Sequence, residues 1–155
     1  MKKLILLIIT ISSLNAMSTN QIKLIKMIKK EARKYTRYKS TIAAICLVES
    51  SAGIHVLGDD GDSLGILQIQ VLTARYAGTL NKELHFLTRM PKKYIETLLL
   101  KNDNLSIKIA CTLINHYIKY YGYKHAVSKY NGGYNNTTYF NKVKRALRII
   151  NKIRG

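Results

Sequence analysis

The sequence predicts an all-α domain, predominantly helical, with one small β-hairpin near residues 56–64. Apolar residues recur at helical spacing along most of the chain, and the single proline, Pro91, stands where a helix can begin. One Asp-Gly pair, Asp60-Gly61, marks a two-residue hairpin turn. At 155 residues the chain has the length of one domain with its own core.

The first 16 residues have the pattern of an export signal. Lys2 and Lys3 precede an apolar run over residues 4–11, and small residues end the segment at Ala16. The mature domain is therefore predicted to be residues 17–155. Leu14 is larger than the residue preferred three places before a cleavage site, so a retained anchor stays an alternative. No transmembrane span is expected in the mature chain, because no later apolar run approaches about 18 residues.

Two helices are predicted before the hairpin. Residues 20–35 alternate apolar and basic side chains at helical spacing, which indicates an amphipathic surface helix. Ser40 is a good N-cap for the next helix, and every residue from 42 to 48 is apolar. That helix has no polar face, so we expect it to be buried on nearly all sides.

Several helices are predicted after the hairpin. Gly78 with Asn81 indicates a loop, and Gly122 is a natural end for a core helix. We expect Pro91 to be the first residue of its helix, and Asp103 or Asn104 to cap the next one. The predicted helical segments are 66–76, the helix that begins at Pro91, 105–121, 124–130 and 138–153.

The charge predicts an anionic partner. The 26 Lys and Arg outnumber the 8 Asp and Glu, which gives a net charge of +18, and loss of Lys2 and Lys3 leaves +16. Nucleic acid, acidic lipid and the carboxylate-rich bacterial wall all fit this sign. The basic residues are scattered along the whole chain, which favours a general basic exterior over a nucleic-acid-binding arm.

Two cysteines, Cys46 and Cys111, each lie in an apolar helical stretch. Two interpretations stay open, namely two buried free thiols or one disulfide between packed helices. Neither cysteine has a His or Cys at zinc-ligand spacing. We therefore predict no metal and no cofactor.

Glu49 is the most informative acidic residue, because it follows seven apolar residues at the end of the predicted buried helix. Desolvation disfavours a charged carboxylate, so the pKa of Glu49 is expected to be raised. A carboxyl group that keeps its proton near neutrality can act as a general acid. The alternative is a Glu that only marks the exposed end of a buried helix.

Three blocks follow one another in the sequence: VESSAG at residues 48–53, GDDGDSLGILQI at 58–69 and AVSKYNGG at 126–133. Their order and spacing resemble the lytic transglycosylases of the soluble, goose-lysozyme-like superfamily, and the resemblance covers residues 38–145. It implies a lysozyme-like fold and cleavage of peptidoglycan glycan strands. In that family one carboxyl group acts as acid and then as base, and the product carries a 1,6-anhydro-muramic end.

The resemblance also implies roles for residues of the first two blocks. Glu49 matches the catalytic acid, and Ser50 matches the small polar residue that follows it. Gly65 matches a glycine that lets the backbone approach the sugar, and Gln68 matches a glutamine whose amide binds an N-acetyl group. The remaining positions assigned to the substrate cleft are Ser63 and Leu67, the latter where the family usually has Met.

Later positions match as well. Tyr130 corresponds to a tyrosine whose hydroxyl reaches the catalytic carboxyl, and Asn131 to an asparagine that contacts substrate. Tyr139 resembles a tyrosine of the last helix that lines the cleft. The sequence departs from the family's Asn-Ile-x-x-Gly block, where it has Ser106 and Ala110. Residues 78–101 are longer than the simplest family members need, and one wall of the cleft is a candidate role for them.

Other functions remain as alternatives. Asp59, Asp60 and Asp62 offer a second carboxylate, although turn residues are their simpler interpretation. A muramidase would use water to break the same bond, and an inactive wall-binding protein or a basic nucleic-acid-binding protein would not break it. The export signal and the three ordered blocks favour the enzyme over a nucleic-acid-binding protein, and the intact Glu49 favours it over an inactive wall-binding protein. Nucleic acid is therefore not expected as a partner. We expect an exported protein of the periplasm or wall, acting alone or with an envelope-spanning secretion or conjugation apparatus.

Overall fold

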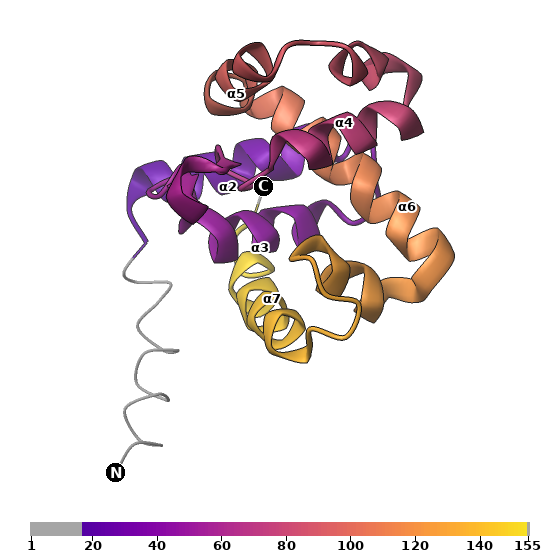
Figure 1. Ribbon diagram of the computed structural model, residues 1–155. Helices are drawn as coiled ribbons and strands as arrows, with labels where there is room; N and C mark the ends of the chain where they lie inside the picture. The colour runs from indigo at the N-terminus through magenta and orange to yellow at the C-terminus, as the bar shows by residue number, and fades with distance from the viewer. Residues whose placement is uncertain (1–16, 155) are drawn as a thin grey trace.

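The computed structural model describes residues 17–154 and confirms the all-α prediction (Figure 1). The predicted export signal, residues 1–16, lies outside the described residues. Within residues 17–154 we find no helix with the length and apolar character that crossing a membrane requires. In chain order the elements are α2 Thr19–Ala32, α3 Lys39–Ser50, β1 Leu57–Gly58, η1 Asp59–Gly61, β2 Ser63–Leu64, α4 Val71–Leu80, η2 Lys82–Thr88, α5 Lys92–Lys101, α6 Asp103–Tyr130 and α7 Thr137–Ile150.

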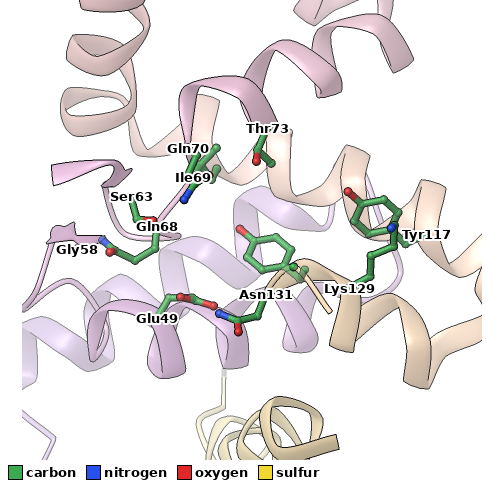
Figure 2. A pocket seen from close by; sticks show the side chains of 12 residues that line it. Glu49, Gly58, Ser63, Gln68, Ile69, Gln70, Thr73, Tyr117, Lys129 and Asn131 are labelled. Atoms are coloured by element: carbon green, nitrogen blue, oxygen red, sulfur yellow. The ribbon is translucent and has the colours of Figure 1, made fainter. Parts of the chain in front are cut away.

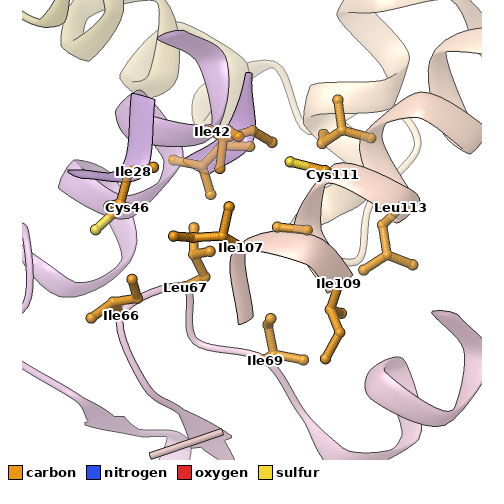
Figure 3. Packing of buried hydrophobic residues seen from close by; sticks show 14 of the residues in the cluster. Ile28, Ile42, Cys46, Ile66, Leu67, Ile69, Ile107, Ile109, Cys111 and Leu113 are labelled. Carbon is orange, nitrogen blue, oxygen red and sulfur yellow. The ribbon is translucent and has the colours of Figure 1, made fainter. Parts of the chain in front are cut away.

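Helix α3 lies at the centre of the fold, packed between α2 and α7 and in contact with α6 (Figure 1). The side chains of residues 42–46 are completely buried, as the apolar run predicts. Figure 3 shows the surrounding core, to which α3, α6 and the segment after the hairpin contribute. The prediction that Ser40 is the N-cap is wrong, because α3 begins at Lys39 and Ser40 lies inside the helix. The N-cap residue is Tyr38, whose side chain makes no capping hydrogen bond.

The β-hairpin forms where the Asp-Gly pair predicts it. Leu57 pairs with Leu64 and Gly58 pairs with Ser63 in an antiparallel arrangement, all within residues 56–64. Asp60 has a φ of 55°, a left-handed turn conformation that Asp adopts more readily than most residues. Residues 51–56 connect the end of α3 to the hairpin, and this short connection brings the second block of the sequence close to Glu49.

Helix α4 differs from the helix predicted over residues 66–76. Helix α4 begins at Val71 rather than Ile66, because Gly65 and Gln68 have φ values of 74° and 48° and form a turn before it. Gly78 lies inside the helix and not in a loop. A Cβ at Gly78 would stand 2.8 Å from the carbonyl oxygen of Leu84, so the glycine permits close packing of η2 on α4.

The later helices form near their predicted positions. Helix α5 begins at Lys92, one residue after the predicted start, so Pro91 is its N-cap residue rather than its first residue. The Asn102 side chain, rather than Asp103 or Asn104, caps α6 by accepting a hydrogen bond from the Leu105 amide. Gly122, with φ 74° and ψ 167°, interrupts α6 where the sequence predicts two separate helices.

Candidate active site

A cleft of about 570 Å³ opens beside the end of α3, within the size range of ligand pockets. The hairpin, the turn before α4, the first turn of α4 and the middle and end of α6 form its walls (Figure 2). The sequence blocks around Glu49, Gln68 and Tyr130 therefore meet in one place. The described residues that line the cleft are Glu49, Gly58, Ser63, Gln68, Ile69, Gln70, Thr73, Tyr117, Lys129, Tyr130, Asn131 and Gly132.

Glu49 is half-buried in the last turn of α3 and lines the cleft. The hydroxyl of Tyr139 on α7 donates a hydrogen bond of 2.5 Å to Oε1 of Glu49. The family resemblance implies that the Tyr130 hydroxyl reaches this carboxyl, and the structure shows Tyr139 as a donor to it as well as a hydrogen bond from Tyr130 to Leu67. Helix α7 packs directly against α3, and this packing brings Tyr139 into hydrogen-bonding position.

Tyr139 is itself held in place from its own helix. The Asn136 side chain caps α7 by accepting a hydrogen bond of 3.0 Å from the backbone amide of Tyr139. The Asn136 amide also donates to Oδ1 of Asn131, which lines the cleft. Burial, followed by the negative charge of Glu49, raises the pKa of Tyr139 above its usual value. Tyr139 therefore keeps its proton in neutral solution and remains a hydrogen-bond donor.

Tyr130 connects α6 to the turn before α4. Its hydroxyl donates a hydrogen bond of 3.0 Å to the carbonyl oxygen of Leu67. Burial, with the nearby charge of Glu49 as the second cause, raises the pKa of Tyr130 well above its ordinary value. The neutral phenol thus ties the end of α6 to the turn that carries Gln68 into the cleft.

Gln68 lines the cleft in a left-handed conformation, with φ 48°. Its side-chain nitrogen donates to the carbonyl oxygens of Gly65 and His55, at 2.9 and 3.3 Å. Gly58 leaves the space for this side chain, because a Cβ there would stand 2.1 Å from Oε1 of Gln68. The amide nitrogen therefore holds the loop together, which the sequence comparison did not predict.

Four of the expected cleft residues, Ser50, Gly65, Leu67 and Tyr139, are not among those that line it. Tyr139 is 6% exposed and contacts the Glu49 carboxyl instead. Ser50 is completely buried, and its hydroxyl donates to the carbonyl oxygen of Ile66 at 2.8 Å and accepts from the Gly53 amide. Leu67 is a core side chain with no exposed surface. Gly65 approaches protein backbone, because a Cβ there would stand 2.2 Å from the carbonyl oxygen of Leu99. Ser50, Leu67 and Gly65 pack beneath the cleft lining and do not contact the cleft itself.

Two other expected residues do line the cleft. Ser63 lies on β2 and is almost completely buried. Asn131 follows the last residue of α6 and is exposed. In Figure 2 the Glu49 side chain extends toward Asn131. A group bound in the cleft would therefore meet the carboxyl and this amide together.

Sequence reasoning missed several cleft residues. Gln70 and Thr73 were placed within a helix predicted to begin at Ile66, whereas α4 begins at Val71. The sequence therefore did not indicate that these two side chains line the cleft. Tyr117 belongs to the core helix predicted over residues 105–121 and is 8% exposed, yet it also lines the cleft. Lys129 also lines the cleft, and its place directly before Tyr130 and Asn131 in the third block is a signal that could have identified it.

Asp60, Asp62 and residues 78–101 lie outside the cleft. Asp60 and Asp62 are exposed and are not among the residues that line the cleft. Residues 78–101 do not line the cleft either, so the proposed wall is a wrong assignment. Helix η2 packs against α4, and α5 packs against α4 and α6. The segment therefore supports the helices that carry cleft residues.

Both cysteines are free and buried, so the disulfide alternative is not what the structure contains. Figure 3 shows Cys46 on α3 and Cys111 on α6, with the Cys46 thiol directed away from Cys111. Desolvation raises the pKa of each thiol to about 12. Both side chains are therefore uncharged core residues at neutral pH.

The family comparison agrees with this geometry. The sequence model described as the transglycosylase SLT domain matches residues 26–152, which include every residue that lines the cleft. Searches of curated proteins and of solved structures found no match. The matched segment spans most of the chain, and the chain therefore belongs to the family of transglycosylase SLT domains.

Proposed function

We propose that this protein is a peptidoglycan lytic transglycosylase in which Glu49 is the catalytic acid and then the base. Membership of the SLT family indicates lytic transglycosylase activity on peptidoglycan. The observation that carries the assignment to Glu49 is its place in the cleft, with Tyr139 donating a hydrogen bond to Oε1. The bond to be cleaved is the β-1,4 bond between N-acetylmuramic acid and N-acetylglucosamine.

In the first step the Glu49 carboxyl gives its proton to the glycosidic oxygen. The bond between that oxygen and the anomeric carbon of muramic acid breaks, and the N-acetylglucosamine side leaves as an alcohol. The N-acetyl group of the substrate stabilises the anomeric carbon, so no protein nucleophile is needed.

In the second step Glu49 acts as a carboxylate. It takes the proton from the C6 hydroxyl of the same muramic residue, whose oxygen bonds to the anomeric carbon. The product is a 1,6-anhydro ring, no water is consumed, and Glu49 ends the cycle protonated. A hydrolase would instead direct a water molecule to the anomeric carbon and leave a reducing end.

The surroundings of Glu49 support this cycle. The carboxyl is half-buried at the end of an apolar helix, an environment that disfavours its charged form. Tyr139 restricts the orientation of the carboxyl, and its own raised pKa keeps it a donor in both steps. Gln70, Thr73 and Asn131 supply polar groups for amino sugars along the cleft.

Mass spectrometry of digested sacculi tests the proposal. Purified peptidoglycan treated with the protein should release muropeptides with 1,6-anhydro ends, each 18 Da lighter than its hydrolysed counterpart by the mass of one water. Reducing ends in their place would make the protein a muramidase. An undigested sacculus would contradict enzymatic function altogether and leave a wall-binding protein.

We also propose that the protein acts outside the cytoplasm, where peptidoglycan lies. Residues 1–16 carry the sequence pattern of an export signal, with a basic start and an apolar run. Fusion of residues 1–20 to a reporter that is active only after export should give active reporter. A reporter that remains inactive would contradict export by this segment. Local opening of the wall for an envelope-spanning apparatus is a role consistent with such an enzyme.

A further inference from the structure

Aromatic rings form a continuous strip on the surface next to the cleft. The centroid of His116 lies 5.9 Å from that of Tyr76 and 4.7 Å from that of Tyr120. Tyr121 continues the series, with centroid distances of 6.5 Å to Tyr120 and 5.5 Å to Tyr134. We name this surface the tyrosine strip, and its members are Tyr76, His116, Tyr117, Tyr120, Tyr121 and Tyr134.

Most of these rings are exposed. Tyr120 is 61% exposed, Tyr134 46%, Tyr76 41% and Tyr121 38%. Packing in the core therefore does not account for them. A contiguous group of exposed aromatic rings, bordered by charged side chains, is typical of a binding surface.

The strip is continuous with the cleft at two points. Tyr117 lines the cleft and its ring lies 5.8 Å from His116 and 6.3 Å from Tyr121. On the opposite side Thr73 of α4 lines the cleft, and Tyr76 lies one helical turn further along. The Tyr76 hydroxyl and Nε2 of His116 are 3.1 Å apart in a hydrogen bond that joins α4 to α6.

Positive charge accompanies the rings. Nζ of Lys129 lies 5.5 Å from the ring centroid of Tyr117 and 5.4 Å from that of Tyr121, and Lys129 also lines the cleft. Nζ of Lys119 lies 5.4 Å from the ring centroid of Tyr120. Each ammonium group stays near an aromatic face and is available to a carboxylate on the same ligand.

We propose that the tyrosine strip is an accessory binding site for a glycan strand that extends beyond the cleft. Sugar rings present faces of C–H groups that pack on aromatic rings, and the carboxylates of the wall glycan and its peptides match Lys119 and Lys129. The choice of wall glycan as the ligand rests on the proposed function. Single-stranded nucleic acid also combines stacking with negative charge, so it serves as the competing outcome.

The test measures binding of the protein to purified sacculi by co-sedimentation. All proteins carry Glu49→Gln, so that the sacculi remain intact during the measurement. Tyr120→Ala removes the most exposed ring of the strip, and Tyr120→Phe keeps that ring. Tyr94→Ala is the matched control, because Tyr94 on α5 is 65% exposed and Tyr120 is 61% exposed.

Tyr120→Ala should weaken binding about three- to tenfold, the scale of a single aromatic contact. Tyr120→Phe and Tyr94→Ala should bind as tightly as the parent protein. Both tyrosines are exposed, so unchanged thermal unfolding of each variant verifies that the fold is intact.

Equal binding by the Tyr120→Ala and Tyr94→Ala proteins would overturn the proposal. So would a Tyr120→Ala protein that loses affinity for a single-stranded oligonucleotide but not for sacculi. The readout needs no turnover, so it is separate from the test of function. Absence of anhydro products from the wild-type protein would end the proposed function, while the comparison of variants decides the binding site independently.

Discussion

The hydroxyl of Tyr139 donates a 2.5 Å hydrogen bond to Oε1 of Glu49 and so connects α7 to the end of α3. Ninety positions separate the two residues in the sequence. The contact makes the orientation of the proposed catalytic carboxyl depend on the packing of the last helix. Changes in α7 should therefore alter catalysis, although no residue of α7 is among the described residues that line the cleft.

Tyr139→Phe removes the donor and keeps the ring. A hydrogen bond to a carboxylate favours its charged form, so its loss should raise the pKa of Glu49. The proposed acid must be protonated, and activity is lost as pH rises through its pKa. The alkaline limb of kcat/KM should therefore move to higher pH in this variant, with a lower maximum.

Tyr123→Phe is the control for that experiment, because its hydroxyl also makes a contact between helices, at 2.9 Å from Oγ1 of Thr41. Its pH profile should match that of the wild type. An alkaline limb that stays in place in Tyr139→Phe would show that the contact does not act on the titrating group.

Tyr130→Phe should affect stability through the turn before α4. The substitution removes the donor to the carbonyl oxygen of Leu67 and should lower the free energy of unfolding by about 1 kcal/mol. Chemical denaturation measures this change. A variant with wild-type stability and a displaced pH profile would instead show that Tyr130 acts on the proposed catalytic carboxyl, as the family resemblance implies.

Gly65→Ala should be one of the most destabilising small substitutions. The new Cβ meets the Leu99 carbonyl oxygen, and the residue has a φ of 74°. The backbone conformation costs about 1–2 kcal/mol and the overlap adds about 1–3 kcal/mol. Gly132→Ala has a similar φ, 81°, with open space around its Cβ, and should incur only the first cost. Equal losses of unfolding free energy in the two variants would contradict the close packing at Leu99.

The two thiols should be unreactive in the native protein and reactive after denaturation. Burial and a pKa of about 12 leave little thiolate on Cys46 or Cys111 at pH 8. Titration with a thiol reagent in denaturant, without reductant, should count two thiols. A count of none would show that the cysteines form a disulfide after all.

Alkaline pH should destabilise the fold. The raised pKa values of the two thiols and of Tyr117, about 12 in each case, mean that the folded protein keeps protons that the unfolded chain releases. The stability from these groups is fully present below about pH 9 and is lost as pH rises toward 12. Each group removes up to about 1.4 kcal/mol per pH unit above its unfolded pKa. Denaturation curves that do not change between pH 8 and 11 would contradict this burial.

The sequence predicts the central helix and the place of Glu49 because both depend on one local pattern, an apolar run that ends in an acid. The hairpin is equally local, since Asp60 and Gly61 determine the turn. The turn at Gln68 was not foreseen, because a left-handed conformation is uncommon for a residue other than glycine. Helix α4 consequently begins five residues later than predicted, and Gln70 and Thr73 were overlooked.

The contacts of Tyr130 and Tyr139 could not be predicted from local patterns. Both residues belong to the family-like segment, and the direction of each hydroxyl depends on how α6 and α7 pack around α3. The same holds for Gly65, whose missing side chain makes room for Leu99, 34 positions further along the chain. Such long-range contacts leave no periodic signal in a single sequence.

The most direct test of the account is the activity of Glu49→Gln on purified sacculi. Loss of the acid should reduce release of anhydro-muropeptides at least about a hundredfold, with the fold intact by circular dichroism. Glu96→Gln, which changes a partly exposed carboxyl paired with Lys92 on α5, should retain wild-type activity. Undiminished release of anhydro-muropeptides by Glu49→Gln would contradict the account.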